Sequence, residues 1–207
     1  MLWVETARVR LLVLLLLLVP PLPALSALPS VDAMLAERSL GSPTAKVRII
    51  EYSSLTCSHC ADFHRETLPQ IREQFIDKGL VRYVVRDFPL DSRATAAAIV
   101  AACVPPNHYF GFIDMLFRDQ ADWAKSPKPL EDLKGRAQLA GLAAADFDPC
   151  INNKALLDGI QVRAVEAQKR DTIESTPTFI INGRKLAGAL PFADFKTAID
   201  EALAKAK

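Results

Sequence analysis

Residues 51–60 read EYSSLTCSHC and mark the point where a predicted strand passes into a predicted helix. The strand covers residues 46–53, whose β-branched and apolar side chains are typical of a buried strand. The helix covers residues 58–75, where apolar side chains recur at helical intervals. Cys57 and Cys60 therefore lie at a helix start, and the segments on either side define the fold around them.

Those segments predict an α/β fold. Residues 80–85 form a second predicted strand, and the strand–helix–strand order makes these two strands parallel. Residues 178–187 (TFIINGRKLA) predict a β-hairpin, because the central Asn-Gly pair suits a type I′ turn. A closing amphipathic helix is predicted over residues 191–205.

The middle of the chain is predicted to be helical throughout. Its helices cover residues 91–104, 108–120, 129–141 and 153–170. Asp91 and Asn107 are the predicted N-caps of the first two helices, because short polar side chains accept hydrogen bonds from exposed helix amides. The inner face of the last helix is predicted to carry Leu156, Leu157, Ile160 and Val165.

Composition limits the class of protein. The chain has 207 residues, of which 25 are basic and 24 acidic, for a formal net charge of +1. This balance argues against nucleic-acid binding, which rewards a basic surface. With 50% hydrophobic and 24% charged residues the chain can bury a core, which excludes a disordered protein. We therefore expect one compact domain with an insertion.

The first residues predict export. Arg8 and Arg10 precede the apolar run 11–19, and small residues follow at 24–27, as in a signal peptide with its cleavage site. Residues 1–26 are assigned to this signal peptide, and residues 30–40 to a short amphipathic lead-in. An exported protein can keep disulfide bonds.

Cys57 and Cys60 predict redox chemistry. The first turn of a helix has unpaired amides and the positive end of the helix dipole, and both stabilise a thiolate at Cys57. Cys57 is therefore the predicted nucleophile, and Cys60 is the thiol that resolves a mixed disulfide. His59 is predicted to add positive charge beside the thiolate. His64 and His108 have no comparable partner in the sequence and are interpreted as ordinary residues.

Two alternatives compete with this interpretation. A zinc site requires two more ligands at matching spacing, and the sequence has neither a second Cys-x-x-Cys nor a His-x₃-His. A purely structural disulfide between these two positions closes too small a loop to stabilise the fold much. Neither a metal nor an organic cofactor is expected.

The pattern as a whole resembles the DsbA-like branch of the thioredoxin superfamily. The resemblance covers residues 41–207, and its most specific marks are EYSSLTCSHC (51–60), VRDFPL (85–90) and STPTFIING (175–183). It implies an α/β thioredoxin fold with an inserted all-helical subdomain. On this basis the first half of the thioredoxin domain covers residues 27–88, the helical insertion residues 89–171 and the second half residues 172–207.

The resemblance also implies roles for single residues. Pro177 corresponds to a cis-proline beside the cysteine pair, which would expose the backbone of Thr176 so that an extended substrate can pair with it. Glu51 corresponds to a buried carboxylate that relays the proton of Cys60. Ser58 stands where the most oxidising relatives have Pro, which leaves the oxidising power of the pair open.

The implied function is that of an exported thiol-disulfide oxidoreductase, above all an oxidase that introduces disulfides into secreted proteins. Such a protein is a monomer of the bacterial periplasm that acts on unfolded or partly folded chains. A membrane quinone-linked, DsbB-like thiol oxidase restores its disulfide. His59 favours an oxidase, whereas a residue like Thr176 recurs in isomerases. A reductase and a non-catalytic holdase for unfolded chains also compete with the oxidase.

Cys103 and Cys150 lie in the helical middle of the chain. In an oxidising compartment two remaining cysteines in one subdomain are expected to pair, giving a structural disulfide. The alternative is two separate buried thiols. The apolar side chains of residues 109–117 are interpreted mainly as core, with one or two of them facing the active site as a groove for unfolded substrate.

Overall fold

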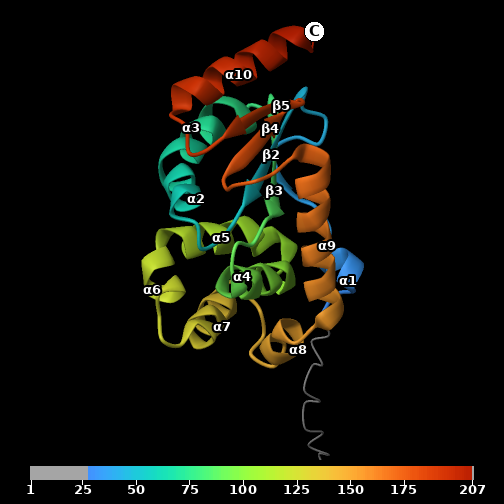
Figure 1. The fold of residues 1–207 in the computed structure, drawn as a ribbon, viewed down its shortest axis with the longest axis vertical. Helices are drawn as coiled ribbons and strands as arrows, with labels where there is room; N and C mark the ends of the chain where they lie inside the picture. Colours follow the sequence, from blue (N-terminus) through green and yellow to red (C-terminus); the bar gives the residue numbers. More distant parts are fainter. Residues whose placement is uncertain (1–27, 207) are drawn as a thin grey trace, which may run out of the picture.

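The computed structural model describes residues 28–206, so the predicted signal peptide, residues 1–26, lies outside the described residues. A five-stranded mixed sheet with the order β1-β3-β2-β4-β5 forms the centre of the fold (Figure 1). Its strands are β1 (Arg38–Leu40), β2 (Val47–Ser53), β3 (Val81–Asp87), β4 (Thr178–Ile181) and β5 (Arg184–Ala187). The predicted α/β class is confirmed.

The strand that leads to the cysteines lies in the middle of the sheet. β2 and β3 are parallel, as the strand–helix–strand order predicts. On its other side β2 pairs antiparallel with β4, which places Glu51 opposite Phe179. β4 and β5 form the predicted hairpin, and Asn182 and Gly183 have the positive φ angles, 44° and 93°, that a type I′ turn requires. The lead-in was not predicted to contain a strand, yet its last residues form β1, antiparallel to β3.

The helix that follows the cysteine motif packs against the sheet. It consists of α2 (Ser58–Asp62), η1 (Phe63–Thr67), α3 (Leu68–Ile71) and η2 (Arg72–Ile76) without a break. The chain stays helical past Pro69, with wider π turns before and after it. The ring centroid of Phe63 lies 4.5 Å from that of Phe179 and 5.3 Å from that of Phe195. These rings join η1, β4 and the closing helix α10 (Phe192–Lys205).

The other helices gather beyond one end of the sheet, and α9 runs back along its side (Figure 1). They are α1 (Val31–Met34), α4 (Ser92–Cys103), η3 (Pro106–His108), α5 (Tyr109–Arg118), α6 (Gln120–Ala124), α7 (Pro129–Leu139), α8 (Phe147–Ile151) and α9 (Lys154–Asp171). Asp91 caps α4 as predicted, because its Oδ1 accepts from the Ala94 amide at 2.8 Å. Within residues 28–206 no helix is both long and apolar enough to cross a membrane.

Two details of the helical prediction are wrong. Asn107 lies inside η3 and caps no helix, since α5 begins at Tyr109. Val165 is 48% exposed, whereas Ala167 is buried. The buried residues of α9, Leu156, Ile160 and Ala167, lie on one face of the helix, and Val165 is not on that face.

One apolar core runs through the sheet and the helical middle. It includes Phe179 of β4, Phe117 of α5 and Trp123 of α6. The Trp123 indole is fully buried and donates a hydrogen bond to the Leu116 carbonyl at 2.8 Å. This packing holds α5 in place beside the helix that carries the cysteines.

Candidate active site

Cys57 and Cys60 are both free thiols, placed at the start of α2. Cys57 is the N-cap residue, with an extended backbone (φ −78°, ψ 121°), so its side chain leaves the helix axis at the positive end of the dipole. Its sulfur is half-buried and lies 3.3 Å from the Thr176 carbonyl, to which it donates when it is protonated. Gln120 of α6 donates to the Cys57 carbonyl at 3.0 Å and to the Leu55 carbonyl at 2.9 Å. The helical middle therefore braces the loop that presents Cys57.

The surroundings of Cys57 lower the pKa of its thiol to about 5. The largest cause is a hydrogen bond that the Cys60 thiol donates to the Cys57 sulfur, and it outweighs partial burial, which acts in the opposite direction. The Thr176 side chain and the amides of Cys60 and His59 lower the pKa further. The Thr176 hydroxyl has no partner elsewhere in residues 28–206, so it is available to the Cys57 sulfur. Cys57 is thus a thiolate at neutral pH.

Cys60 has the opposite character. Its side chain is fully buried, and burial is the largest cause of a strongly raised pKa. The hydrogen bond to Cys57 and the negative charge of Glu51 raise the pKa further. Cys60 therefore keeps its proton while Cys57 is ionised, which suits an internal thiol that acts after the nucleophile.

Ser58 and His59 lie on the exposed side of the helix start. The His59 side chain is 73% exposed, and its Nδ1 lies 3.9 Å from Oδ2 of Asp62. It is the backbone amide of His59 that acts on Cys57, whereas its ring was predicted to do so. An imidazole that is largely in water contributes little field at a neighbouring sulfur.

The Thr176–Pro177 peptide bond is cis, in line with the resemblance to a cis-proline family. It lies just before β4, and this brings a segment over one hundred residues away in sequence against the cysteine motif. The carbonyl of Pro177 accepts from the Gly188 amide at 2.8 Å. Thr178 fixes the same turn, because its hydroxyl donates to the Ser175 carbonyl at 2.7 Å.

A buried polar cluster lies beneath Cys60. Glu51, on the central strand β2, is fully buried, and its Oε2 accepts from the Tyr83 hydroxyl and lies 3.2 Å from His64 Nε2. The other nitrogen of His64, Nδ1, lies 3.1 Å from Oδ1 of Asp114 on α5. Burial alone would lower the pKa of His64, but the charges of Glu51 and Asp114 outweigh it and raise the pKa to about 9. His64 is therefore an imidazolium at neutral pH.

His64 thus differs from its interpretation as an ordinary residue, and this interpretation is wrong. Its position four residues after Cys60 places it one turn further along the same helical run, which is a signal present in the sequence. Its partner Asp114 comes from the helical middle, which no local pattern connects to residue 64. His108 does behave as interpreted, since its Nδ1 contacts only the Ala140 carbonyl, at 2.9 Å, among hydrogen-bonding groups of the described chain.

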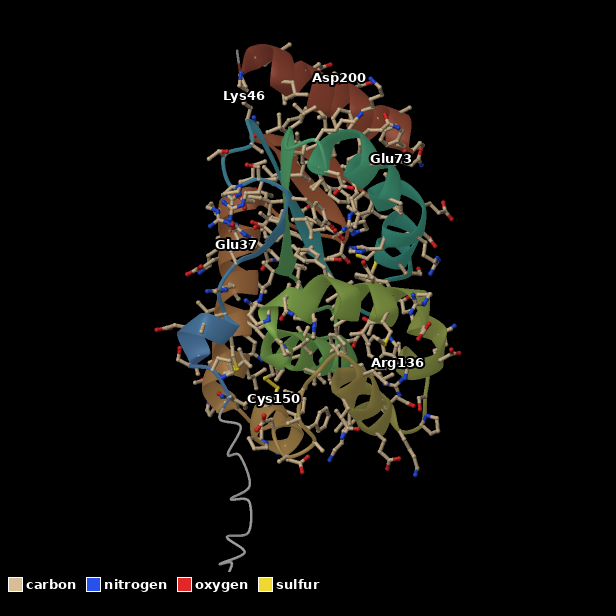
Figure 2. All side chains as sticks on the ribbon, turned by 180° about the vertical axis from the view of Figure 1, so that it is seen from behind. Glu37, Lys46, Glu73, Arg136, Cys150 and Asp200 are labelled. Atoms are coloured by element: carbon tan, nitrogen blue, oxygen red, sulfur yellow. A yellow bond between two sulfur atoms is a disulfide. The ribbon has the colours of Figure 1, made fainter. Side chains whose placement is uncertain are left out.

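Cys103 and Cys150 form a disulfide that joins α4 to α8, with a Cα–Cα distance of 6.2 Å. Figure 2 shows Cys150 among the helices at the end of the molecule away from α10. The bridge is therefore separate from the Cys57–Cys60 pair. Among residues 28–206 no group of three or more His, Cys, Asp or Glu side chains is arranged to hold a metal ion.

The apolar cluster of residues 109–117 is mostly core. Tyr109, Phe112, Leu116 and Phe117 are buried. The ring of Phe117 lies 4.1 Å from the imidazole of His64, so this helix packs directly on the polar cluster. A separate cavity of about 260 Å³ lies between β1, β3 and α9, and its lining includes neither cysteine.

Comparisons with known proteins agree with this geometry. A family model described as thioredoxin matches residues 34–201. A "Putative protein-disulfide oxidoreductase" of Rickettsia felis is 30% identical over 169 residues, which cover 81% of this chain and 60% of that protein. Among solved structures, Wolbachia pipientis alpha-DsbA1 matches with a TM-score of 0.77 and 34% identity, over 82% of this chain and 92% of the other. A protein-disulfide isomerase of Novosphingobium aromaticivorans matches with a TM-score of 0.69 and 26% identity, over 81% and 97%.

The structure defines a thioredoxin-fold protein in which a helical region is inserted between β3 and β4 and two neighbouring thiols of opposite character lie at the start of α2. The chain belongs to the thioredoxin family, and within it to the DsbA-like proteins. It spans about 60% of the length of the curated relatives that match it first.

Proposed function

We propose that this protein is an exported oxidase that introduces disulfide bonds into other proteins through Cys57 and Cys60. The proposal is carried by the opposite character of two neighbouring sulfurs, a low-pKa Cys57 that is partly accessible and a high-pKa Cys60 that is buried. A stable Cys57 thiolate favours the reduced form of the pair. A pair that favours its reduced form is a strong oxidant of other thiols.

Oxidation proceeds by two thiol exchanges. A substrate thiolate attacks Sγ of Cys57, the Cys57–Cys60 bond breaks, and the sulfur of Cys60 takes up a proton because its pKa is high. A second thiolate of the substrate then attacks the substrate sulfur of the mixed disulfide and displaces Cys57 as a thiolate. The substrate loses two electrons and gains a disulfide, and the protein is left with the reduced pair.

An unfolded substrate would bind beside Thr176 and Pro177. The cis bond holds the Thr176 carbonyl against the Cys57 sulfur, and the Thr176 N–H has no hydrogen-bond partner within residues 28–206. An extended chain pairing with this backbone would place its own cysteine at Cys57. Main-chain pairing is largely independent of side chains, which suits an enzyme with many substrates.

The proposal includes a cellular setting. Residues 1–26 would direct the chain to the periplasm and be removed, and the mature protein would act there as a monomer on unfolded or partly folded exported proteins. A membrane quinone-linked, DsbB-like thiol oxidase would restore the disulfide. In this scheme residues 27–88 and 172–207 form the thioredoxin domain and residues 89–171 the helical insertion.

A disulfide isomerase is the second candidate function. Thr176 before the cis-proline favours it, as does the similarity to the Novosphingobium isomerase. Isomerisation starts from the reduced pair, because the Cys57 thiolate must attack a substrate disulfide. The two functions therefore require opposite redox states of the same cysteines.

The test uses the purified protein in each redox state. The oxidised protein should form the disulfide of a reduced two-cysteine peptide, and Cys57→Ser should abolish the reaction. In Cys60→Ser, Cys57 is first converted to a mixed disulfide with nitrothiobenzoate; a peptide with a single cysteine should then form a lasting mixed disulfide with Cys57, because no second thiol is present to displace it. A reduction potential near about −120 mV indicates an oxidase, and one near about −270 mV a reductant. Repair of a scrambled protein by the reduced form, without peptide oxidation, would instead identify an isomerase. Protection of an unfolded chain from aggregation without any thiol exchange would identify a holdase and overturn the proposal.

A further inference from the structure

The sulfur of Cys60 must exchange a proton in every catalytic cycle, yet it has no access to water. Opening the Cys57–Cys60 disulfide adds a proton to this sulfur, and closing the disulfide removes it. The Cys60 side chain is fully buried. A proton leaving it therefore needs a neighbouring group that can accept it and a way for the resulting charge to reach the surface.

Glu51 is placed to accept the proton. Its Oε2 is occupied by the Tyr83 hydroxyl and His64, whereas its Oε1 is buried without a hydrogen-bond partner in residues 28–206. The Glu51 charge also raises the pKa of the Cys60 thiol, and Glu51 lies on β2, the strand that leads to the cysteine motif. Protonation of a lone buried carboxylate next to an imidazolium would, however, leave a net positive charge in the core.

His64 and Asp114 supply the connection to solvent. The His64 side chain is 2% exposed, and its two nitrogens face different carboxylates, Glu51 on the inside at 3.2 Å and Asp114 on the outside at 3.1 Å. The Asp114 side chain is 46% exposed and meets water directly. The three residues come from β2, η1 and α5, so this row of groups exists only in the folded protein.

We propose that His64 and Asp114 form the proton exit for Cys60, with His64 as a positioning residue that keeps the buried pair neutral. When the disulfide closes, the Cys60 proton passes to Oε1 of Glu51 and the Nδ1 proton of His64 passes to Asp114 and then to water. The pair changes from Glu51 carboxylate with imidazolium to Glu51 acid with neutral imidazole, and its net charge stays zero. When the disulfide opens, both transfers run in reverse. The inference rests on the proposed thiol exchange at Cys57 and Cys60.

Other titratable groups around the cluster are compatible with this role. Tyr83 donates to Glu51, and the Glu51 charge also acts on Tyr109; burial raises the pKa of both tyrosines well above the usual value, so they stay neutral. The Glu51 and Asp114 charges keep His64 protonated at rest. The imidazolium is therefore ready to release a proton when Glu51 becomes neutral.

The test isolates closure of the disulfide. Cys57 is converted to a mixed disulfide with nitrothiobenzoate, and attack by Cys60 releases the coloured thiolate, whose rate is followed from pH 5 to pH 9. In His64→Gln the buried Glu51 loses its cationic partner, and no imidazolium is present to pass a proton on to Asp114, so the route from Cys60 to the surface is interrupted. We expect closure at pH 7 to slow by about tenfold or more, and the rising limb of the pH profile to move to higher pH.

Two further variants separate this role from a structural one. Asp114→Asn, at a half-exposed position, should slow closure in the same direction by a smaller factor. His108→Gln, a matched change at a histidine that contacts the Ala140 carbonyl and has no hydrogen bond to Glu51 or Asp114, should behave like the wild type. In all three variants alkylation of Cys57 should keep its wild-type pH profile, which shows that the nucleophile is intact.

The outcomes are distinguishable. Wild-type closure profiles in both His64→Gln and Asp114→Asn would overturn the proton exit while leaving the proposed function in place. The proton exit is equally overturned if His64→Gln fails to fold and Asp114→Asn closes like the wild type. A wild-type protein that neither closes the mixed disulfide nor oxidises a peptide would instead remove the proposed function itself.

Discussion

Replacing Cys60 by alanine tests the origin of the reactive thiolate. The hydrogen bond from Cys60 is the largest of the effects that lower the pKa of Cys57 to about 5. A hydrogen bond to a charged group contributes about 1.5–3 kcal/mol, which at about 1.36 kcal/mol per unit equals roughly one to two pKa units. Because Cys57 is only half-buried, solvent screening favours the lower value. We expect the pKa of Cys57 to rise by about one unit in Cys60→Ala.

The assay is the rate of Cys57 alkylation by iodoacetamide as a function of pH, with the product located by mass spectrometry. The wild-type protein should alkylate at Cys57 alone, since Cys60 is buried and the other two cysteines are paired. Cys60→Ser is the conservative variant, because its hydroxyl can still donate to the thiolate, and its midpoint should lie nearer the wild type. Coincident midpoints for Cys60→Ala and the wild type would refute the assigned hydrogen bond.

Three other perturbations have calculable outcomes. The pKa of Cys57 is lowered on folding from 9.0 to about 5, so its thiolate stabilises the reduced form fully above pH 9 and this contribution is lost as the pH falls through 5. The four-unit shift corresponds to about 5 kcal/mol, which solvent screening reduces. We therefore expect the free energy of unfolding of the reduced protein, relative to that of the oxidised protein, to rise by about 2–3 kcal/mol from pH 5 to pH 9. If denaturant titrations give the same difference between the two forms at both pH values, the low pKa is contradicted. Replacing both Cys103 and Cys150 by alanine should lower the free energy of unfolding by about 4 kcal/mol and leave the alkylation midpoint of Cys57 unchanged; a shifted midpoint would show that the bridge reaches the site. Thr176→Val removes a hydroxyl that lowers the pKa of Cys57, so the midpoint should rise, though by less than in Cys60→Ala; an unchanged midpoint assigns no role to that hydroxyl.

Local sequence signals predicted most of the fold correctly. The parallel strands and the hairpin depend on short segments whose β-branched residues and Asn-Gly turn act over a few positions. β1 was missed because three residues form a strand only by pairing with β3, more than forty positions later. Its neighbour Glu37 depends on similar long-range contacts, since it forms ion pairs with Arg48, Arg82 and Arg86.

The candidate site shows the same division. The position of Cys57 at a helix start follows from residues on either side of it, so the sequence alone predicts the thiolate. The effect of the His59 ring on the thiolate cannot be predicted from the sequence, because the exposure of the ring depends on which side of α2 faces the protein. His64 acquires its charge from Glu51 and Asp114, and Asp114 lies fifty positions away on a helix whose packing no periodicity reveals.

The bridge between α4 and α8 is a product of the same kind of reaction that we propose for Cys57 and Cys60. A newly made chain carries four thiols, which can join in three ways, and a single arrangement gives the mature molecule. Oxidised copies already present could supply the bond that a fresh copy lacks. Formation of the Cys103–Cys150 disulfide would then be autocatalytic: slow while few oxidised molecules exist and faster as they accumulate.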